Sequence, residues 1–325
     1  MRRFDFVLAG LLCAACVVPF APARADDLQA CLRPGQSSAD SRIAACTRAI
    51  ESGAAAGRAL SGAYLSRGQA YSALSQYGRA IADYDRIVAM EPAPAQVADA
   101  LVLRGAAKAA KGNPRQGLAD IDRALGLGLP PASSAVAFYY RGLANADLKS
   151  YAAAASDLGK AIALGFDTPR AYAYRGSANA ARGDYAQAIR DFDKAIALDP
   201  ARASSYGGRC WALGQAGYLE RALKDCNQAM ELDPTLVLNY EARGLVYEGM
   251  GLYGWAEKDY RRALRLDSTS KAAIGGIERI AMVPDDEPPP QPEVKSRGAT
   301  VVQPAAQKRQ KKRHEIIGRQ YAPQQ

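Results

Sequence analysis

Hydrophobic side chains recur at three- and four-residue steps along most of the chain, in segments of helical length separated by short breaks. This spacing is typical of helices that bury one face. Glycines interrupt the pattern inside the repeating segments at Gly112, Gly183, Gly217 and Gly251, and prolines end it at Pro92, Pro200 and Pro234. The pattern therefore predicts an all-α chain in which helices come in pairs.

The same pattern repeats about every 34 residues. An arginine, followed by Gly or in one case Cys, recurs at steps of 37, 37, 34, 34 and 34 residues, and an aspartate follows each arginine 16 residues later. The pairs are Arg67 and Asp83, Arg104 and Asp120, Arg141 and Asp157, Arg175 and Asp191, Arg209 and Asp225, and Arg243 and Asp259. A fixed period of this length indicates a repeat architecture. We expect six units, at residues 61–97, 98–134, 135–168, 169–202, 203–236 and 237–270.

One unit carries the pattern most fully, with Tyr172, Gly176, Tyr185, Ala188, Phe192, Ala195 and Pro200. This resembles the tetratricopeptide repeat family, which has the same period and two helices per unit. The resemblance implies a right-handed superhelical solenoid of antiparallel helix pairs. Residues 26–60 then form a degenerate first repeat or cap, and residues 271–282 form a closing helix over the last apolar face. We assign the three extra residues of each of the first two units to longer turns at Ala93–Val97 and Pro130–Ser134.

The arginine and aspartate columns have two interpretations. Six arginines at fixed places could form a site for an anionic ligand. Counted inward from the two ends of a helix pair, however, each Arg lies level with its Asp, and the two columns together carry no net charge. Charges buried between helices need partners. We therefore interpret the twelve residues as a structural ladder, within or between units.

The N-terminus resembles a secretory signal peptide. Arg2 and Arg3 precede an apolar run from Val7 to Phe20, and Ala23-Arg24-Ala25 offers a cleavage site. We expect residues 1–25 to be removed and the protein to be exported, to the periplasm or outside the cell. A membrane anchor is the alternative, but the run is shorter than the roughly 20 residues that cross a bilayer. A lipoprotein form through Cys16 is a second alternative.

Four cysteines lie beyond the predicted cleavage site. In one unit Cys210 stands in the otherwise glycine column and Cys226 in the facing column of bulky core residues, so a bond between them explains both changes. Cys31 and Cys46 have nearly the same separation. We predict disulfides Cys31–Cys46 and Cys210–Cys226, as an exported chain permits. Buried free thiols are the alternative.

Charge adds little for the body of the chain. Much of the net charge of +9 belongs to the first 25 residues and to the tail after Val283, which argues against nucleic acid as the partner. Residues 283–325 combine Pro288-Pro289-Pro290 with the basic run Lys308–Arg313, so we expect a disordered tail that could contact anionic surfaces. The oligomeric state is open.

The residue types argue against an enzyme. The only histidine, His314, lies in the tail, which excludes a histidine-based catalytic or zinc site in the repeats. No glycine-rich phosphate or dinucleotide motif is present. We therefore expect no catalytic residues, no cofactor and no metal.

The family resemblance places partner binding on the first helices of the units, along a concave face. Their outward residues would then contact a protein or peptide, with Trp211 and Tyr139 as aromatic anchors. The candidates are Tyr139, Leu143, Asp147, Ser177, Trp211, Glu241, Leu245 and Glu248. The acidic members suggest a partner with Lys or Arg. We thus expect a protein-binding scaffold. The alternative is a helper in the assembly or export of an envelope polymer, contacting carbohydrate or anionic lipid.

Overall fold

The computed structural model describes residues 25–33, 38–90 and 93–283. The signal-peptide prediction, apart from Ala25, and nearly all of the predicted tail, including the basic run Lys308–Arg313, lie outside these residues. In the described part, no helix has the length and apolar character needed to cross a membrane.

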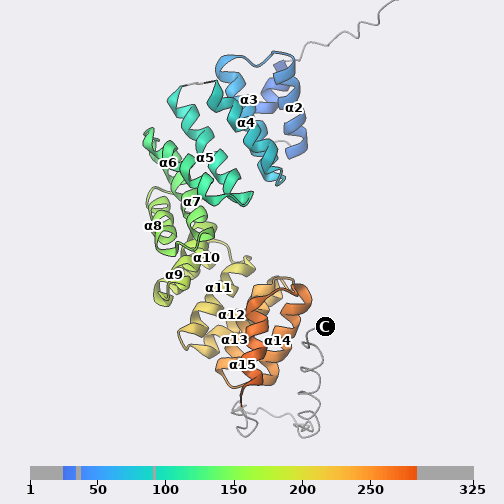
Figure 1. Ribbon diagram of the computed structural model, residues 1–325, viewed down its shortest axis with the longest axis vertical. Coiled ribbons are helices and arrows are strands. Elements are labelled where there is room, and N and C mark those ends of the chain that lie inside the picture. The colour runs from blue at the N-terminus through green and yellow to red at the C-terminus, as the bar shows by residue number, and fades with distance from the viewer. Residues whose placement is uncertain (1–24, 34–37, 91–92, 284–325) are drawn as a thin grey trace, which may run out of the picture. The chain divides into compact units, whose positions relative to one another are not determined.

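The described residues form fifteen α-helices and no strand, which confirms the predicted all-α repeat solenoid. Each helix packs against the one before it and the one after it, and the first helices of successive units also touch (Figure 1). The six pairs are α3 (Gly57–Ala73) with α4 (Tyr77–Ala89), α5 (Pro94–Ala110) with α6 (Pro114–Gly126), α7 (Pro131–Asp147) with α8 (Tyr151–Ala163), α9 (Pro169–Ala181) with α10 (Tyr185–Leu198), α11 (Ala203–Gln215) with α12 (Leu219–Leu232), and α13 (Val237–Gly249) with α14 (Tyr253–Leu266).

Shorter elements flank the six pairs. Helices α1 (Ala25–Leu32) and α2 (Ala39–Glu51) pack on α3, where the sequence predicts a degenerate repeat. Helix α15 (Lys271–Ala281) packs on α13 and α14. Ala273, Ile277 and Ile280 of α15 join Tyr240 and Tyr260 in one buried cluster. The last helix pair therefore does not expose its apolar face.

The extra residues of the early units are helical, so their assignment to longer turns is wrong. Helices α3, α5 and α7 have 17 residues, whereas α9, α11 and α13 have 13. Helix α5 begins at Pro94 and α7 at Pro131, about one turn before the predicted unit boundaries at 98 and 135. Proline suits the first helical position because its fixed φ is helical and its missing N–H has no partner there.

The turn inside each unit needs one residue with a left-handed backbone. Gly112, Gly183, Gly217 and Gly251 have φ between 72° and 92°. The first and third units have Ser75 and Lys149 at this place, with φ of 57° and 60°. Such a conformation is costly for a residue with a Cβ atom, so these two turns carry backbone strain.

A glycine column marks the closest approach of the two helices in a unit. A Cβ atom on Gly68 would lie 2.6 Å from a ring carbon of Tyr84, and one on Gly142 would lie 2.8 Å from Cγ of Leu158. The facing bulky residue is fully buried in each unit. The glycines thus let the second helix place a large side chain in the core.

Candidate functional site

Each arginine of the ladder binds the aspartate 16 residues later in the same unit. Two parallel hydrogen bonds, from Nε and Nη2 of the guanidinium to the two carboxylate oxygens, measure 2.6 to 3.0 Å in all six pairs. The aspartates are buried. This fork geometry is the strongest form of ion pairing in proteins, and it joins the first helix of a unit to its second.

The third nitrogen of the same arginines reaches the preceding unit. Nη1 of Arg104 donates to Asp85 and Nη1 of Arg141 to Asp122, at 2.7 and 2.8 Å. The remaining contacts of this kind are Arg67 with Thr47, Arg209 with Asp193 and Arg243 with Asn227. One guanidinium thus connects three helices, so the ladder works both within and between units.

The chain of contacts between units has one gap, at the junction of α8 and α9. The acceptor column has Gly159 where neighbouring units have Asp122 and Asp193. A Cβ atom added to Gly159 would lie 3.7 Å from Nη1 of Arg175. Arg175 consequently binds Asp191 in its own unit but has no side-chain acceptor on α8.

The carboxyl group of Asp120 shows how the ladder contacts change a pKa. Burial works to raise the pKa of Asp120, but hydrogen bonds from Arg104 and Lys108 outweigh it, so the pKa lies below its usual value. The Lys108 Nζ atom is 2.8 Å from the carboxylate. The charged form of Asp120 is therefore the one that the fold stabilises.

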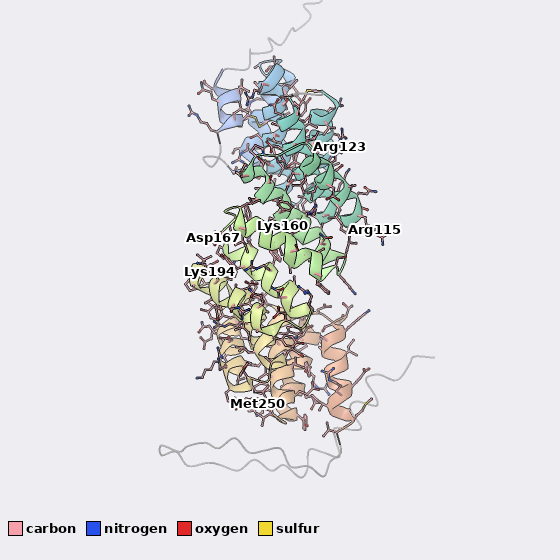
Figure 2. The ribbon with its side chains drawn as sticks, turned by 90° about the vertical axis from the view of Figure 1, so that its left-hand side faces the viewer. Arg115, Arg123, Lys160, Asp167, Lys194 and Met250 are labelled. Atoms are coloured by element: carbon pink, nitrogen blue, oxygen red, sulfur yellow. A yellow bond between two sulfur atoms is a disulfide. The ribbon has the colours of Figure 1, made fainter. Side chains whose placement is uncertain are left out.

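In four of the six units an aromatic residue stands three positions before the ladder arginine, and the guanidinium lies over its ring. The guanidinium of Arg141 lies 5.1 Å from the ring centre of Phe138, and that of Arg175 lies 5.5 Å from that of Tyr172. Lys160 and Lys194, which Figure 2 labels, belong to second helices. Their Nζ atoms lie 5.3 and 6.0 Å from the centres of the same two rings. These contacts explain the aromatic column as part of the ladder, because cations are attracted to ring faces.

Both cysteine pairs lie at bonding distance. The Cα atoms of Cys31 and Cys46 are 4.7 Å apart and those of Cys210 and Cys226 are 5.3 Å apart, and each pair forms a disulfide. These separations are ordinary for disulfides. All four residues are fully buried. One bond joins α1 to α2, and the other joins α11 to α12.

A groove of about 630 Å³ runs over the first helices of the later units, and we call it the α9–α15 groove. Helices α9, α11, α13 and α15 line it, and a volume of this size suits a bound ligand or several side chains of a peptide. Its apolar walls are made by Tyr174, Trp211, Leu238 and Leu245. Leu238 is 71% exposed, so much of this apolar surface faces solvent.

The α9–α15 groove exists because small residues stand at positions where α7 has bulky residues. Positions equivalent to Tyr139 carry Ala173 and Gly207, and a position equivalent to Tyr140 carries Gly208. The floor comes from the second helices. A Cβ atom on Gly208 would lie 2.5 Å from the ring of Phe192, and one on Gly276 would clash with the ring of Tyr260. Phe192 and Tyr260 both reach the groove.

Four of the eight predicted partner-binding residues line the groove, namely Ser177, Trp211, Glu241 and Leu245. Ser177 is exposed, and Trp211 is half-buried with its ring 6.0 Å from that of Tyr185. The structure thus brings residues of three units to one surface.

The other four predicted partner-binding residues lie elsewhere. Tyr139 is only 8% exposed and packs on Phe166, with ring centres 4.6 Å apart, so its interpretation as an outward anchor is wrong. Its extra bulk against the next unit buries it. Leu143 packs in the same cluster. Asp147 is exposed at the end of α7, outside the groove.

Glu248 is not free for a partner because α15 binds it. Nε and Nη2 of Arg279 donate to its carboxylate at 2.7 and 2.9 Å, and the hydroxyl of Tyr260 donates at 2.8 Å. Glu241 in turn accepts a hydrogen bond from Ser270, the N-cap of α15. The two carboxylates expected to attract a cationic partner thus hold the closing helix instead.

Sequence comparison agrees with the repeat geometry. Two family models of the tetratricopeptide repeat match the chain, one at residues 169–201 and the other at 61–94 and 239–270. These three segments of the chain are tetratricopeptide repeats. Each matched segment contains one Arg–Asp pair and covers all or most of the two helices that carry it. No curated protein matches the sequence.

Solved structures resemble the stack of tetratricopeptide repeats. The Cut9–Hcn1 hetero-tetramer of APC/C matches with a TM-score of 0.59 and 16% identity, over 78% of this chain and 54% of that one. A tetratricopeptide repeat protein from Parabacteroides merdae matches with a TM-score of 0.53 and 18% identity, over 75% of this chain and 92% of that one. At these identities the likeness concerns the fold alone.

Proposed function

We propose that this protein is a non-enzymatic scaffold that binds a segment of a partner protein in the α9–α15 groove. The observation that carries the proposal is the groove itself, which is lined by first helices of successive units and combines small residues with Tyr174, Trp211 and Leu245. Exposed apolar hollows of this kind are rare on surfaces that bind nothing, and aromatic side chains dominate interface energies. The repeats support the same function.

The partner segment is extended or helical, since a groove along stacked helices presents a long, narrow surface. We also propose that the protein is exported, with cleavage after Ala25. Two disulfides in one chain support an oxidising location. The mass of the mature N-terminus tests the export proposal directly, because a retained Met1 contradicts it.

Site-specific photo-crosslinking tests the binding proposal. A photoreactive residue replaces Ser177, which is exposed and lines the groove. The matched control places it at Ala186, which is exposed on α10 and does not line the groove. We expect a stoichiometric crosslink to a protein from Ser177 alone, lost in the Trp211→Ala background. Crosslinks to polysaccharide or lipid, or equal crosslinks from both positions, would contradict the proposal.

A further inference from the structure

The charged side chains that line the α9–α15 groove are mostly cations. Arg170, Arg202 and Arg279 line it, and among the described lining residues Glu241 is the only carboxylate. Arg279 is neutralised by its two hydrogen bonds to Glu248. The charge that a partner meets is therefore set by Arg170 and Arg202 at one end and by Glu241 at the other.

Arg170 and Arg202 form fewer bonds to carboxylates than Arg279 does. Arg170 is exposed at the start of α9 and forms no ion pair within the described residues. Arg202 contacts Asp199 at 3.0 Å, but this pair is partly exposed, and such pairs hold their geometry weakly. The Nε atom of Arg202 is buried without an acceptor. An unpaired buried donor costs free energy, so an incoming carboxylate that recruits this guanidinium gains from it.

Tyrosines frame the same end of the groove. The ring centre of Tyr174, which lines the groove, lies 6.2 Å from that of Tyr139. Burial raises the pKa of Tyr139 to about 12, and the positive charges of Arg170 and Arg202 both oppose that rise. Arg170 precedes Tyr174 by four residues on α9, so these two side chains lie on one face of the helix, and Arg202 lines the same groove.

We propose that the partner segment is acidic. Its carboxylates bind Arg170 and Arg202 beside Tyr174, and an apolar side chain that follows packs on Trp211 and Leu245. Arginine is suited to this role because its planar fork meets a carboxylate with two parallel bonds. This proposal rests on the proposed function and specifies its ligand. It also reverses the cationic partner expected from Asp147, Glu241 and Glu248.

A pair of synthetic peptides tests the charge preference. Both peptides carry Phe and Leu at alternating positions, and the remaining positions are Glu in one and Lys in the other. Binding of each labelled peptide to the full chain is measured by fluorescence anisotropy. We expect the Glu peptide to bind at least about tenfold more tightly, since hydrogen bonds between charged groups are each worth that much or more. Its affinity should also fall with added salt.

Variants that reverse or remove one arginine charge test whether the two arginines cause this preference. Arg170→Glu and Arg202→Gln should each weaken the Glu peptide and leave the Lys peptide unchanged or tighter. Lys224→Glu is the matched control, because Lys224 is exposed on α12 and does not line the groove. Circular dichroism melting checks that each variant folds. Arg170 is exposed, so Arg170→Glu keeps the test decisive even where Arg202→Gln unfolds the chain.

The outcomes separate this inference from the proposed function. Equal binding of both peptides, or a preference for Lys, overturns the acidic partner but leaves a binding groove. Binding of neither peptide overturns the acidic partner, and an absent Ser177 crosslink then overturns the scaffold as well. Inorganic polyphosphate is tested in the same way. If it binds more tightly than the Glu peptide, and Arg170→Glu abolishes this binding, the ligand is a polyanion and the acidic peptide is overturned.

Discussion

Nη1 of Arg175 faces Gly159 across the junction of α8 and α9, at the place where the arginines of neighbouring units meet an aspartate. Gly159 is helical and a Cβ atom there meets only ordinary contact distances. The position can therefore accept a larger side chain without strain.

Gly159→Asp should stabilise the protein by completing the ladder. An added surface ion pair contributes about 0.2–1 kcal/mol. Gly159→Ser is the matched control, since it gives a similar gain in helix propensity with a shorter, uncharged side chain. Thermal melting should place the Asp variant above the Ser variant, with the difference shrinking as salt is added. Equal melting temperatures of the two variants in low salt would show that Arg175 gains nothing from an added carboxylate at position 159.

Stability should depend on pH through Asp120. Its folded pKa lies below its usual value, whereas an unfolded aspartate has a pKa of about 3.9. The charged form thus stabilises the fold above that pH, and this contribution disappears as the pH falls through the folded pKa. Asp120→Asn should flatten the acid side of the stability curve measured by urea unfolding. Asp40→Asn, at an exposed position in α2, serves as the control for the same substitution away from the ladder.

Lys149→Gly should stabilise the turn between α7 and α8. Lys149 has a φ of 60°, which costs roughly 1–2 kcal/mol for a residue with a Cβ atom, while glycine loses about 0.5–1 kcal/mol in added chain entropy. A net gain of roughly 0.5–1 kcal/mol should follow from these two effects. The reciprocal change, Gly183→Ala at a φ of 84°, should lower the melting temperature. Opposite signs in the two variants are the result to look for, and the same sign in both would refute the strain argument.

Trp211→Ala should weaken partner binding by more than about 1 kcal/mol if Trp211 is a hot spot. Trp255→Ala is a natural control because Trp255 is 55% exposed on α14 and does not line the groove. Trp211 also packs in the core, so affinity must be measured per folded molecule by calorimetry. An equal loss of affinity in both variants would move the binding surface away from the groove.

Reduction should destabilise the folded chain. Each disulfide closes a loop with a sequence separation of 15 or 16 residues, and loop closure of that size is worth on the order of 3 kcal/mol. The melting temperature should fall when a reductant is added, and the Cys210→Ala, Cys226→Ala double variant should show part of that fall. Non-reducing peptide mapping of the exported protein is the direct check, and free thiols at all four positions would count against both bonds.

The repeat architecture could be predicted because its evidence is periodic. The offset of 16 residues between each Arg and its Asp brings them level in a helix pair, and the family models match the same units. The extra helical turn before Ala98 and Ala135 could not be predicted in this way. Pro94 and Pro131 are compatible both with a turn and with the first position of a helix, so the sequence pattern does not separate the two.

The groove was harder to predict because it depends on contacts that break the period. Glu248 has the sequence pattern of a free surface acid, but it binds Tyr260 and also Arg279, which is 31 residues away. The burial of Tyr139 depends on how it packs against Phe166 and the following unit. A signal was nonetheless present, since bulky side chains at Tyr139 and Tyr140 give way to Gly207 and Gly208 at equivalent positions.

The exchange of bulky for small residues has a consequence for how such a site evolves. The hollow lies where Ala173, Gly207 and Gly208 stand in columns that hold Tyr139 and Tyr140 one or two units earlier. The Arg–Asp ladder uses other columns, so the site can lie at a different unit while the ladder that joins the helices stays the same. A duplicated or deleted unit, or a few surface substitutions, would shift the hollow along the stack. In this architecture the binding hollow and the Arg–Asp ladder are inherited separately.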